Sequence, residues 1–339
     1  MKYIVDDSCW FGNHAGPKAR NDVNYFLKDW KTVYLIEDRR KGFSSIDAIK
    51  GYIKLYKLLN KDDIVLFQWP LLLGGFWQKH PVVHKIGECK KIVLIHDLVS
   101  LRENVETSFS KEISILNQFD VVISHNNKMT KWLKENGLSR PIVNLELFDY
   151  YAETDRNAET IDMLKPIHSI NIAGNLARIK SGYLYNLDEA SFDSVEINAY
   201  GPNYEDTPKV KYCGSYSPEE LPSKIRRGFG LVWDGDSVNC VSGNYGHYMR
   251  YNNPHKLSLY IRSGLPVIVW KEAAIAEIVK EFNIGFCIDN LNEISNVVCK
   301  CSATQYEEML SNVKELMIQV GTGYFINKAI DEALKAIEK

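Results

Sequence analysis

The sequence predicts an α/β protein with two doubly wound domains, each built around a parallel β-sheet. Continuous runs of valine, isoleucine and leucine alternate with helical stretches along most of the 339 residues, as is typical of strands buried on both faces. A chain of this length exceeds one typical core and fits two domains of ordinary size. The alternation lapses over residues 148–165, where a polar stretch without a clear period indicates a linker.

Composition fits a globular protein without a strong overall charge. Hydrophobic residues make up 45% and charged residues 25% of the chain, and the net charge is -2, which gives no global attraction to nucleic acid. No apolar run approaches the roughly 20 residues of a membrane span, and the N-terminus lacks the apolar core of a signal peptide. We therefore expect a cytoplasmic protein.

Seven cysteines are scattered along the chain without a C-x-x-C pair. Their odd number and spacing favour small buried thiols in a reducing compartment over a disulfide framework. Cys299 and Cys301 form a close pair, but no histidine or third cysteine stands nearby in the sequence. We therefore predict no metal site.

The first predicted domain, residues 1–155, opens with a strand over 3–7, a glycine-containing loop over 8–17 and a helix over 18–30. This is the order of a nucleotide-binding unit, but the G-x-G-x-x-G fingerprint is absent, which disfavours a nicotinamide-dependent oxidoreductase. The same alternation predicts strands at 33–37, 64–69, 91–97, 121–125 and 141–147, and helices at 45–59, 75–87, 104–119 and 128–136.

A second alternation predicts a domain over residues 166–322. Its expected strands are 169–173, 195–200, 210–214, 229–234, 266–270 and 285–288, and its expected helices include 218–226, 272–282 and 306–320. Residues 323–339 close the chain with one apolar stripe, so we expect a helix that packs back towards the N-terminal domain.

The stretch Y-N-N-P-H-K-L-S-L-Y-I-R-S-G-L-P-V-I-V-W at residues 251–270 is the centre of the predicted second domain. Asn252 or Asn253 is expected to cap a short helix, with Pro254 in its first turn. His255 and Lys256 then lie beside free N–H groups at the positive end of the helix dipole, where an anion is favoured. The stretch predicts a phosphate site beside one end of a parallel sheet, and an ordinary surface helix is the alternative.

Several motifs resemble the GT-B glycosyltransferases. K-L-S-L-Y-I-R-S-G-L-P-V-I-V at 256–269 and N-I-G-F at 283–286 are similar to their nucleotide-sugar-binding half. More narrowly, I-H-D-L-V at 95–99 and G-F-G-L-V-W-D at 228–234 resemble a bacterial group. That group contains β-1,6-galactofuranosyltransferases and the glucosyltransferases that extend glycans on serine-rich adhesins. The resemblance covers essentially the whole chain and implies two Rossmann-like domains that face each other across a cleft.

The resemblance implies an inverting, metal-independent hexosyltransferase that uses a UDP-sugar as donor substrate and needs no cofactor. K-A-R-N-D at 18–22 resembles the galactofuranosyl branch, so UDP-galactofuranose is the favoured donor and UDP-glucose the alternative. An alternative of another class is a catalytically silent chaperone subunit that binds a glycan or a partner. Its expected sign is loss of the cations that hold the diphosphate, and both predicted cations are present.

The predicted donor site is centred on Lys256 and Arg178, which would hold the diphosphate. Arg178 follows a Gly-Asn turn at the end of a strand, and the resemblance assigns it to the phosphates. The resemblance also places Tyr216 beside the uracil, where its flat face would stack. A solvated arginine and a packing tyrosine are the alternatives. Further donor-binding candidates are His255 and Asn253 at the helix start, and Gly16, whose loop would approach the sugar closely.

The acceptor hydroxyl needs a base, and Asp97 is our first candidate because it ends a buried strand. An aspartate that caps the next turn is the alternative. His96, Asp22 and His14 are substitutes from the same rim of the sheet. Asp234-Gly235-Asp236 has the form of a metal-binding D-x-D, but a turn is the favoured interpretation.

Partner predictions follow from the resemblance. We expect a UDP-sugar and a glycan, lipid-linked or protein-linked acceptor, no nucleic acid, and as open alternatives a homo-oligomer and peripheral contact with the inner face of the membrane. Residues 236–250 are expected to form a long mobile loop. An apolar cluster is expected to pack in the core, with a lipid-acceptor groove or a subunit interface as alternatives; it comprises Trp69, Pro70, Leu71, Leu72, Leu73, Phe76 and Trp77.

Overall fold

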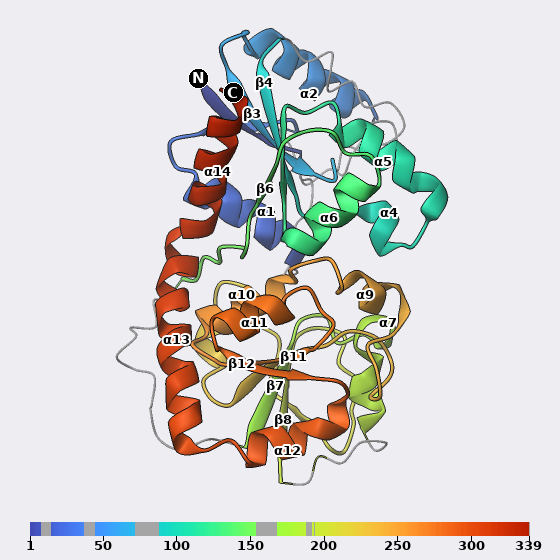
Figure 1. The fold of residues 1–339 in the computed structure, drawn as a ribbon, viewed down its shortest axis with the longest axis vertical. Helices are drawn as coiled ribbons and strands as arrows, with labels where there is room; N and C mark the ends of the chain where they lie inside the picture. Colours follow the sequence, from blue (N-terminus) through green and yellow to red (C-terminus); the bar gives the residue numbers. More distant parts are fainter. Residues whose placement is uncertain are drawn as a thin grey trace. The chain divides into compact units, whose positions relative to one another are not determined.

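The computed structural model of the protein describes residues 1–7, 15–36, 45–71, 88–153, 168–187, 192 and 194–338. These residues form two compact units, each with its own six-stranded sheet (Figure 1). Unit 1 contains most of the chain up to Glu146 together with Phe325–Lys339, and unit 2 contains Leu147–Tyr324. All the strand pairs described in both sheets are parallel, so the predicted α/β, doubly wound fold class is confirmed.

Unit 1 has the strand order β2-β1-β3-β4-β5-β6. The strand order reverses between β1 and β3: β2 lies on one side of β1, and all later strands are added on the other side, still parallel. Its strands are β1 (Lys2–Asp6), β2 (Lys31–Tyr34), β3 (Ile64–Trp69), β4 (Lys90–Ile95), β5 (Val121–Ser124) and β6 (Ile142–Asn144). Its helices include α1 (Ala15–Phe26), α2 (Ser45–Leu58), α4 (Val99–Arg102), α5 (Phe109–Leu116), α6 (Asn127–Glu135) and α14 (Tyr324–Ile337).

Unit 2 has the order β12-β11-β10-β7-β8-β9, which reverses between β10 and β7. Its strands are β7 (Ser169–Ala173), β8 (Glu196–Tyr200), β9 (Lys211–Tyr212), β10 (Phe229–Val232), β11 (Val267–Trp270) and β12 (Gly285–Ile288). Its helices include α7 (Arg178–Ser181), α8 (Leu221–Lys224), α9 (Gly243–Tyr248), α10 (His255–Arg262), α11 (Ala276–Glu281), α12 (Ile294–Cys299) and α13 (Ala303–Thr322). Ligands of such sheets bind beyond the carboxyl ends of the strands at the reversal.

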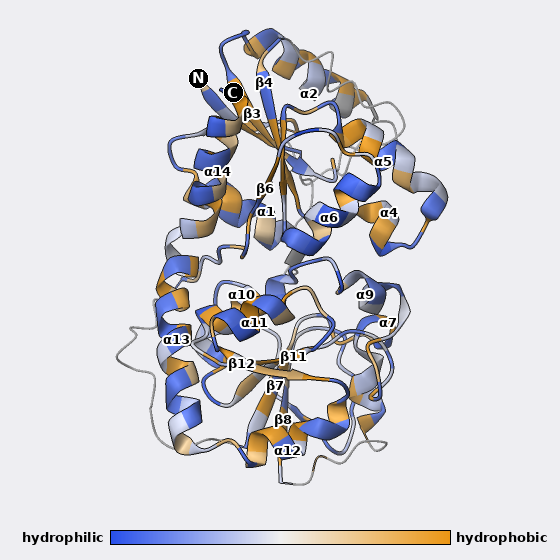
Figure 2. Ribbon diagram, viewed as in Figure 1, coloured by the Kyte–Doolittle hydropathy of each residue, from blue (hydrophilic) through white to orange (hydrophobic). Residues whose placement is uncertain are grey.

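The strands form the buried centre of both units. Every residue of β5, β7, β10 and β11 is buried, and orange in Figure 2 marks the hydrophobic residues of the labelled strands. Helices add one apolar stripe each: α14, for example, buries Phe325, Ile326 and Ile330. Trp69 and Leu71 are also buried, which confirms core packing for that part of the apolar cluster; Leu72, Leu73, Phe76, Trp77 and the predicted helix 75–87 lie outside the described residues.

Several predicted elements differ from the structure. α10 has Pro254 as its N-cap residue, with an extended backbone and no side-chain cap, so the predicted asparagine cap was wrong. The residue before a proline is biased towards extended backbone, and proline itself adopts the N-cap conformation without strain. The predicted loop 236–250 contains the helix α9. The predicted helix 104–119 is interrupted, with α5 beginning only at Phe109 after a 3-10 turn.

Candidate active site

Tyr260 of α10 lies between the carboxyl ends of β7 and β10, the two strands at which the strand order of unit 2 reverses. β7 pairs with β10 only as far as Asn171, although β7 continues to Ala173. Beyond that point the Tyr260 hydroxyl accepts a hydrogen bond from the Ala173 N–H and donates one to the Asn171 carbonyl, both at 2.9 Å. A β-carbon at Gly230 would lie 2.1 Å from the Tyr260 ring, so glycine is required there. The tyrosine thereby separates the carboxyl ends of β7 and β10.

Lys256 lies one turn before Tyr260 and reaches the space that this separation creates. Its ammonium forms an ion pair of 2.7 Å with Asp234 and donates to the Trp233 carbonyl at 3.3 Å. Both charged side chains are close to 90% buried. Burial lowers the pKa of Lys256, and the Asp234 carboxylate opposes that shift. An ammonium has three hydrogens, so one remains after these two hydrogen bonds among the described residues.

Glycines bring the main chain close to Lys256. Gly174 follows β7 with φ +122°, and a β-carbon there would lie 3.4 Å from the Lys256 Cε atom. Gly201 has φ +142°, and its β-carbon would lie 1.9 Å from the Gly174 carbonyl oxygen. L-residues with side chains rarely adopt such backbone angles. The loops after β7 and β8 therefore contact each other through glycine main chain, next to Lys256.

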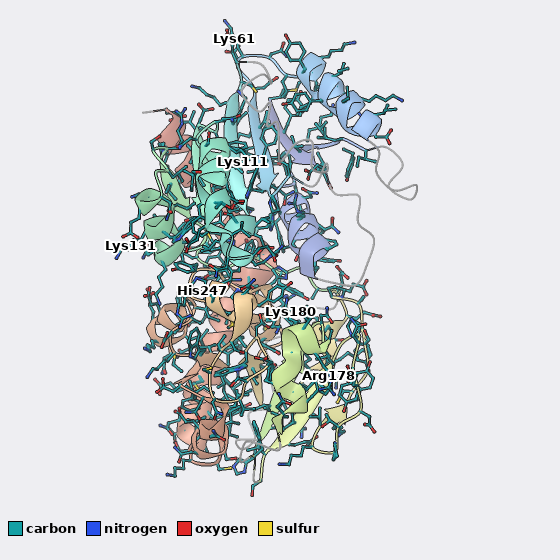
Figure 3. All side chains as sticks on the ribbon, turned by 90° about the vertical axis from the view of Figure 1, so that its right-hand side faces the viewer. Lys61, Lys111, Lys131, Arg178, Lys180 and His247 are labelled. Carbon is teal, nitrogen blue, oxygen red and sulfur yellow. The ribbon has the colours of Figure 1, made fainter. Side chains whose placement is uncertain are left out.

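Arg178 and Lys180 both come from α7 (Figure 3). Arg178 is exposed, forms an ion pair of 2.7 Å with Glu205 and lies over the Tyr185 ring at 4.4 Å. Lys180 lies over the Tyr245 ring at 5.5 Å, and its positive charge further lowers the pKa of Lys256. Lys180 was not among the residues predicted from the sequence. Its position could have identified it, because Lys180 is a second cation in the segment that follows the Gly-Asn turn, two residues after Arg178.

Three other predicted donor-site residues have defined positions. Tyr216 is half-buried, donates to the Cys213 carbonyl at 3.1 Å and has the Lys224 ammonium 5.3 Å from its ring centroid. His255 stacks on Tyr150 with ring centroids 4.9 Å apart. Asn253 is 3% exposed. The Tyr216 ring thus lies beside the positive charge of Lys224, whereas the His255 ring is stacked on a tyrosine.

Asp234-Gly235-Asp236 forms a bend with Gly235 at φ +110°. Asp234 binds Lys256, and Asp236 accepts a hydrogen bond from Ser242 at its side chain. The two carboxylates thus serve different partners. Among the residues that the structure describes, no group of three or more histidine, cysteine, aspartate or glutamate side chains could hold a metal ion.

The predicted acceptor residues of unit 1 follow β4. Asp97 binds Arg102 through an ion pair of 2.8 Å, and both side chains are about one-third exposed. The turn that carries Asp97 is fixed by Glu112, a buried residue of α5. Glu112 accepts hydrogen bonds from the Val99 and Ser100 N–H groups at 3.0 Å. Asp97 does not cap α4, whose N-cap residue is Leu98.

A chain of hydrogen bonds leads from Asp6 to His96. Asn24 donates to Asp6 at 2.9 Å, Gln68 donates to Asn24 at 3.1 Å, and the Gln68 oxygen lies 2.8 Å from His96 Nε2. An ionised carboxylate only accepts, so each amide in turn presents its nitrogen towards Asp6 and its oxygen towards His96. His96 Nε2 must therefore carry a hydrogen, so that Nδ1 is the accepting nitrogen in the neutral form of the ring.

K-A-R-N-D at residues 18–22 forms buried ion pairs inside unit 1. Lys18 pairs with Asp22 at 2.5 Å, and Arg20 pairs with Asp7 at 3.1 Å. Asp22, a substitute base in our sequence reasoning, thus has a lysine at its carboxylate. Gly16 lies within α1 instead of the predicted loop, because the helix begins at Ala15 and a proline is tolerated in a first helical turn. His14 and Gly12 lie outside the described residues.

Comparison with known families decides the identity of the chain. Residues 3–147 match the model described as glucosyltransferase 3-like, N-terminal domain, and residues 170–333 match the corresponding C-terminal domain. The chain belongs to the glucosyltransferase 3-like family. It is 30% identical to β-1,6-galactofuranosyltransferase WbbI of Escherichia coli (strain K12), over 98% of each chain. Glucosyltransferase 3 of Streptococcus gordonii is 28% identical, over 81% of this chain and 80% of that protein. The protein is a glycosyltransferase, and the predicted resemblance is confirmed.

Solved structures confirm the GT-B fold of this family member. HepE of Anabaena, determined in complex with UDP, has a TM-score of 0.63 at 14% identity and covers 99% of this chain and 100% of its own. Sucrose-phosphate synthase of Thermosynechococcus elongatus has a TM-score of 0.55 at 15% identity, over 86% of this chain and 76% of its own. At such identities the likeness concerns the fold.

Proposed function

We propose that this glycosyltransferase transfers a hexosyl group, with inversion, from a UDP-sugar to a hydroxyl of a glycan acceptor in the synthesis of a bacterial surface polysaccharide. The observation that carries the proposal is the buried Lys256 ammonium at the strand reversal of unit 2. A buried cation beside glycine main chain, where no side chain blocks access, can stabilise negative charge strongly, because little water competes with it. That charge develops on the departing diphosphate.

The donor site, in this proposal, is centred on residues of unit 2. Lys256 gives its third hydrogen to a diphosphate oxygen while Asp234 holds its ammonium in place. Arg178 exchanges its ion pair with Glu205 for the phosphates, and Tyr216 stacks on the uracil. Asn253 and His255 complete our proposed set from unit 2, and Gly16 on α1 of unit 1 stays a predicted donor-binding residue. Cationic side chains and a helix start then replace a metal ion as the counter-charge, and no cofactor takes part.

The acceptor hydroxyl is activated, in this proposal, by Asp97 of unit 1. The acceptor oxygen attacks the anomeric carbon, the bond to the diphosphate breaks, and the hydroxyl proton passes to the carboxylate. Arg102 holds one Asp97 oxygen at 2.8 Å and so orients the group. His96 is the alternative base, since its Nδ1 is an accepting nitrogen in the tautomer that Gln68 imposes.

The favoured donor is UDP-galactofuranose, since WbbI, a galactofuranosyltransferase, aligns over 98% of the chain. UDP-glucose is the second candidate, supported by the glucosyltransferase 3 relatives at 28% and 24% identity. The crystal structure of HepE with UDP supports a uridine nucleotide. As acceptors we propose glycans that are free, lipid-linked or protein-linked, and as the compartment the cytoplasm. No helix in the described part of the chain is long and apolar enough to cross a membrane.

The experiment is turnover of UDP-glucose, UDP-galactopyranose and UDP-galactofuranose, with released UDP as the readout and a chelator present. We expect one donor to turn over in the chelator, and both Arg178→Ala and Lys256→Ala to abolish that turnover. Turnover that requires an added divalent metal would contradict the metal-free mechanism. Binding of UDP without turnover of any donor would favour the catalytically silent subunit, and failure to bind UDP would refute the donor site.

A further inference from the structure

The helix α2 carries a stripe of exposed apolar side chains. Ile46 is 63% exposed, Ile49 47%, Ile53 48% and Tyr56 60%. Successive members are three or four residues apart, which places them on one face of the helix. Single exposed apolar residues are common on protein surfaces, but four on one helical face form a continuous patch.

This stripe is additional to the face that α2 packs against its own unit. Leu55 and Leu59 are buried, and a β-carbon at Gly51 would lie 2.6 Å from the Leu35 carbonyl oxygen. Gly51 thus lets the helix approach Leu35, the residue that follows β2. α2 is therefore apolar on two faces, and packing within unit 1 accounts for one of them.

Lysines lie beside the exposed stripe. Lys50, Lys54 and Lys57 are exposed, and at 100° per residue they form a row along one flank of the isoleucines. Lys61, which follows the helix, is also exposed and projects outward (Figure 3). α2 itself contains one acidic residue, Asp47, near its start. Figure 2 shows the result as orange and blue turns that alternate along the ribbon.

We propose that this face of α2, defined by Ile46, Ile49, Ile53, Tyr56 and its lysine row, docks on a membrane surface that contains anionic lipids. A helix with an apolar stripe and flanking lysines lies in the plane of the membrane interface: the apolar side chains enter the acyl region and the lysines bind lipid phosphates. A second copy of the chain fits less well, because a symmetric pairing of two such stripes would gather lysines from both copies around one contact.

The test is sedimentation of the full chain with vesicles of phosphatidylcholine alone or mixed with phosphatidylglycerol. We expect binding to the mixed vesicles that weakens in high salt and is at least about tenfold weaker on phosphatidylcholine alone, since each lysine near an anionic surface adds to the affinity. Equal binding to both vesicles, or no binding to either, would overturn the proposal.

Two pairs of variants locate the contact. Ile49→Ser/Ile53→Ser should reduce binding to mixed vesicles at least about tenfold through lost insertion, whereas Ile318→Ser, at a residue of α13 that is 55% exposed, should not. Lys50→Glu/Lys57→Glu should also reduce it, whereas Lys111→Glu/Lys131→Glu, on α5 and α6, should reduce it far less (Figure 3). Circular dichroism and thermal unfolding confirm that each variant is folded.

The alternative to a membrane is a second copy of the chain that covers the stripe. The oligomeric state, measured by light scattering, distinguishes these two possibilities. If the wild-type chain self-associates, Ile49→Ser/Ile53→Ser dissociates it, and mixed vesicles bind neither form, the stripe is an interface between copies and our proposal is wrong. Unchanged binding of the Ile49→Ser/Ile53→Ser variant to vesicles would also overturn it. This test is independent of turnover, so it stands whether or not the proposed donor is correct.

Discussion

Lys256 and Asp234 illustrate how one buried ion pair can serve both stability and chemistry. The pair is about 90% buried at 2.7 Å, and removing one member leaves an uncompensated charge in the interior. The same low exposure to water that makes this costly strengthens any interaction of the ammonium with a diphosphate. Stability and activity can therefore be separated by substituting one or both residues.

Lys256→Met should lower the free energy of unfolding by about 3–5 kcal/mol, because Asp234 stays buried without its partner. Lys256→Met/Asp234→Asn should regain most of that loss, since no buried charge remains. Both variants should lose at least about 100-fold in kcat/KM, because the cation at the diphosphate is missing. Urea unfolding and UDP release measure the two effects. Wild-type turnover in the double variant would show that Lys256 does not act on the donor.

Gln68 allows the two candidate bases to be distinguished. In Gln68→Glu a carboxylate replaces the amide oxygen 2.8 Å from His96 Nε2, which favours the charged imidazolium. If His96 accepts the acceptor's proton, the rising limb of kcat/KM against pH should move to higher pH by about one unit. If Asp97 is the base, as we propose, the limb should stay in place while Asp97→Asn abolishes turnover. The pH profiles of the wild type, Gln68→Glu and His96→Asn, together with the turnover of Asp97→Asn, decide between them.

At the scale of single elements, the strand ends of unit 1 are joined by a buried histidine. His125 follows β5, is 1% exposed, and its Nε2 lies 2.9 Å from the Ile95 carbonyl at the end of β4. A neutral ring donates to that carbonyl. Burial lowers the pKa of His125 to about 4, so the folded unit keeps this ring neutral under conditions where an unfolded chain would protonate it.

The unfolding free energy should therefore depend on pH through His125. Above pH 6.5, the ordinary pKa of histidine, its contribution is fully present; as pH falls towards 4 the unfolded chain binds a proton that the folded chain does not, and about 3 kcal/mol is lost. His125→Gln keeps a donor but cannot titrate, so its stability should change less over this range. Urea unfolding at pH 7 and pH 4.5 measures the difference. Parallel profiles for both proteins would contradict the assignment.

At the scale of the whole molecule, the last helix of the chain belongs to the same unit as its first strands. Unit 2 begins at Leu147, and the chain returns to unit 1 at Phe325. α14 thus completes a unit whose sheet was formed by the first part of the sequence, and it buries an apolar stripe there. Unit 1 is therefore not a continuous segment, so its stability depends on the last residues of the chain.

Ile330→Ala should show this dependence. Ile330 is 3% exposed on α14, and truncation of a buried isoleucine typically costs about 2–5 kcal/mol. Ile318→Ala, at a residue that is 55% exposed, should cost less than about 1 kcal/mol. Hydrogen exchange should place the loss of protection in β1–β6 and leave β7–β12 unchanged. Equal loss in both sheets would show that the units do not unfold separately.

The sequence by itself determined the parallel sheets, the family and the short helix after Pro254, because runs of buried β-branched residues, proline and glycine act through local sterics and burial. The extents of β3, β7 and β12 matched the predicted ranges. The functional residues were less accessible: Lys180 was missed, and Asp22 was considered as a base although Lys18 neutralises it.

Tertiary structure alone decided which side chains meet. Asp234 and Lys256 are 22 residues apart in the chain, and Tyr260 reaches a strand 89 residues earlier. The order Asp6, Asn24, Gln68, His96 joins four elements through hydrogen bonds. The local sequence pattern cannot predict such pairs, because the residues around each partner form their helix or strand whichever distant residue that partner meets. In each unit, the geometry exists only once its own sheet has formed and has brought the carboxyl ends of neighbouring strands together.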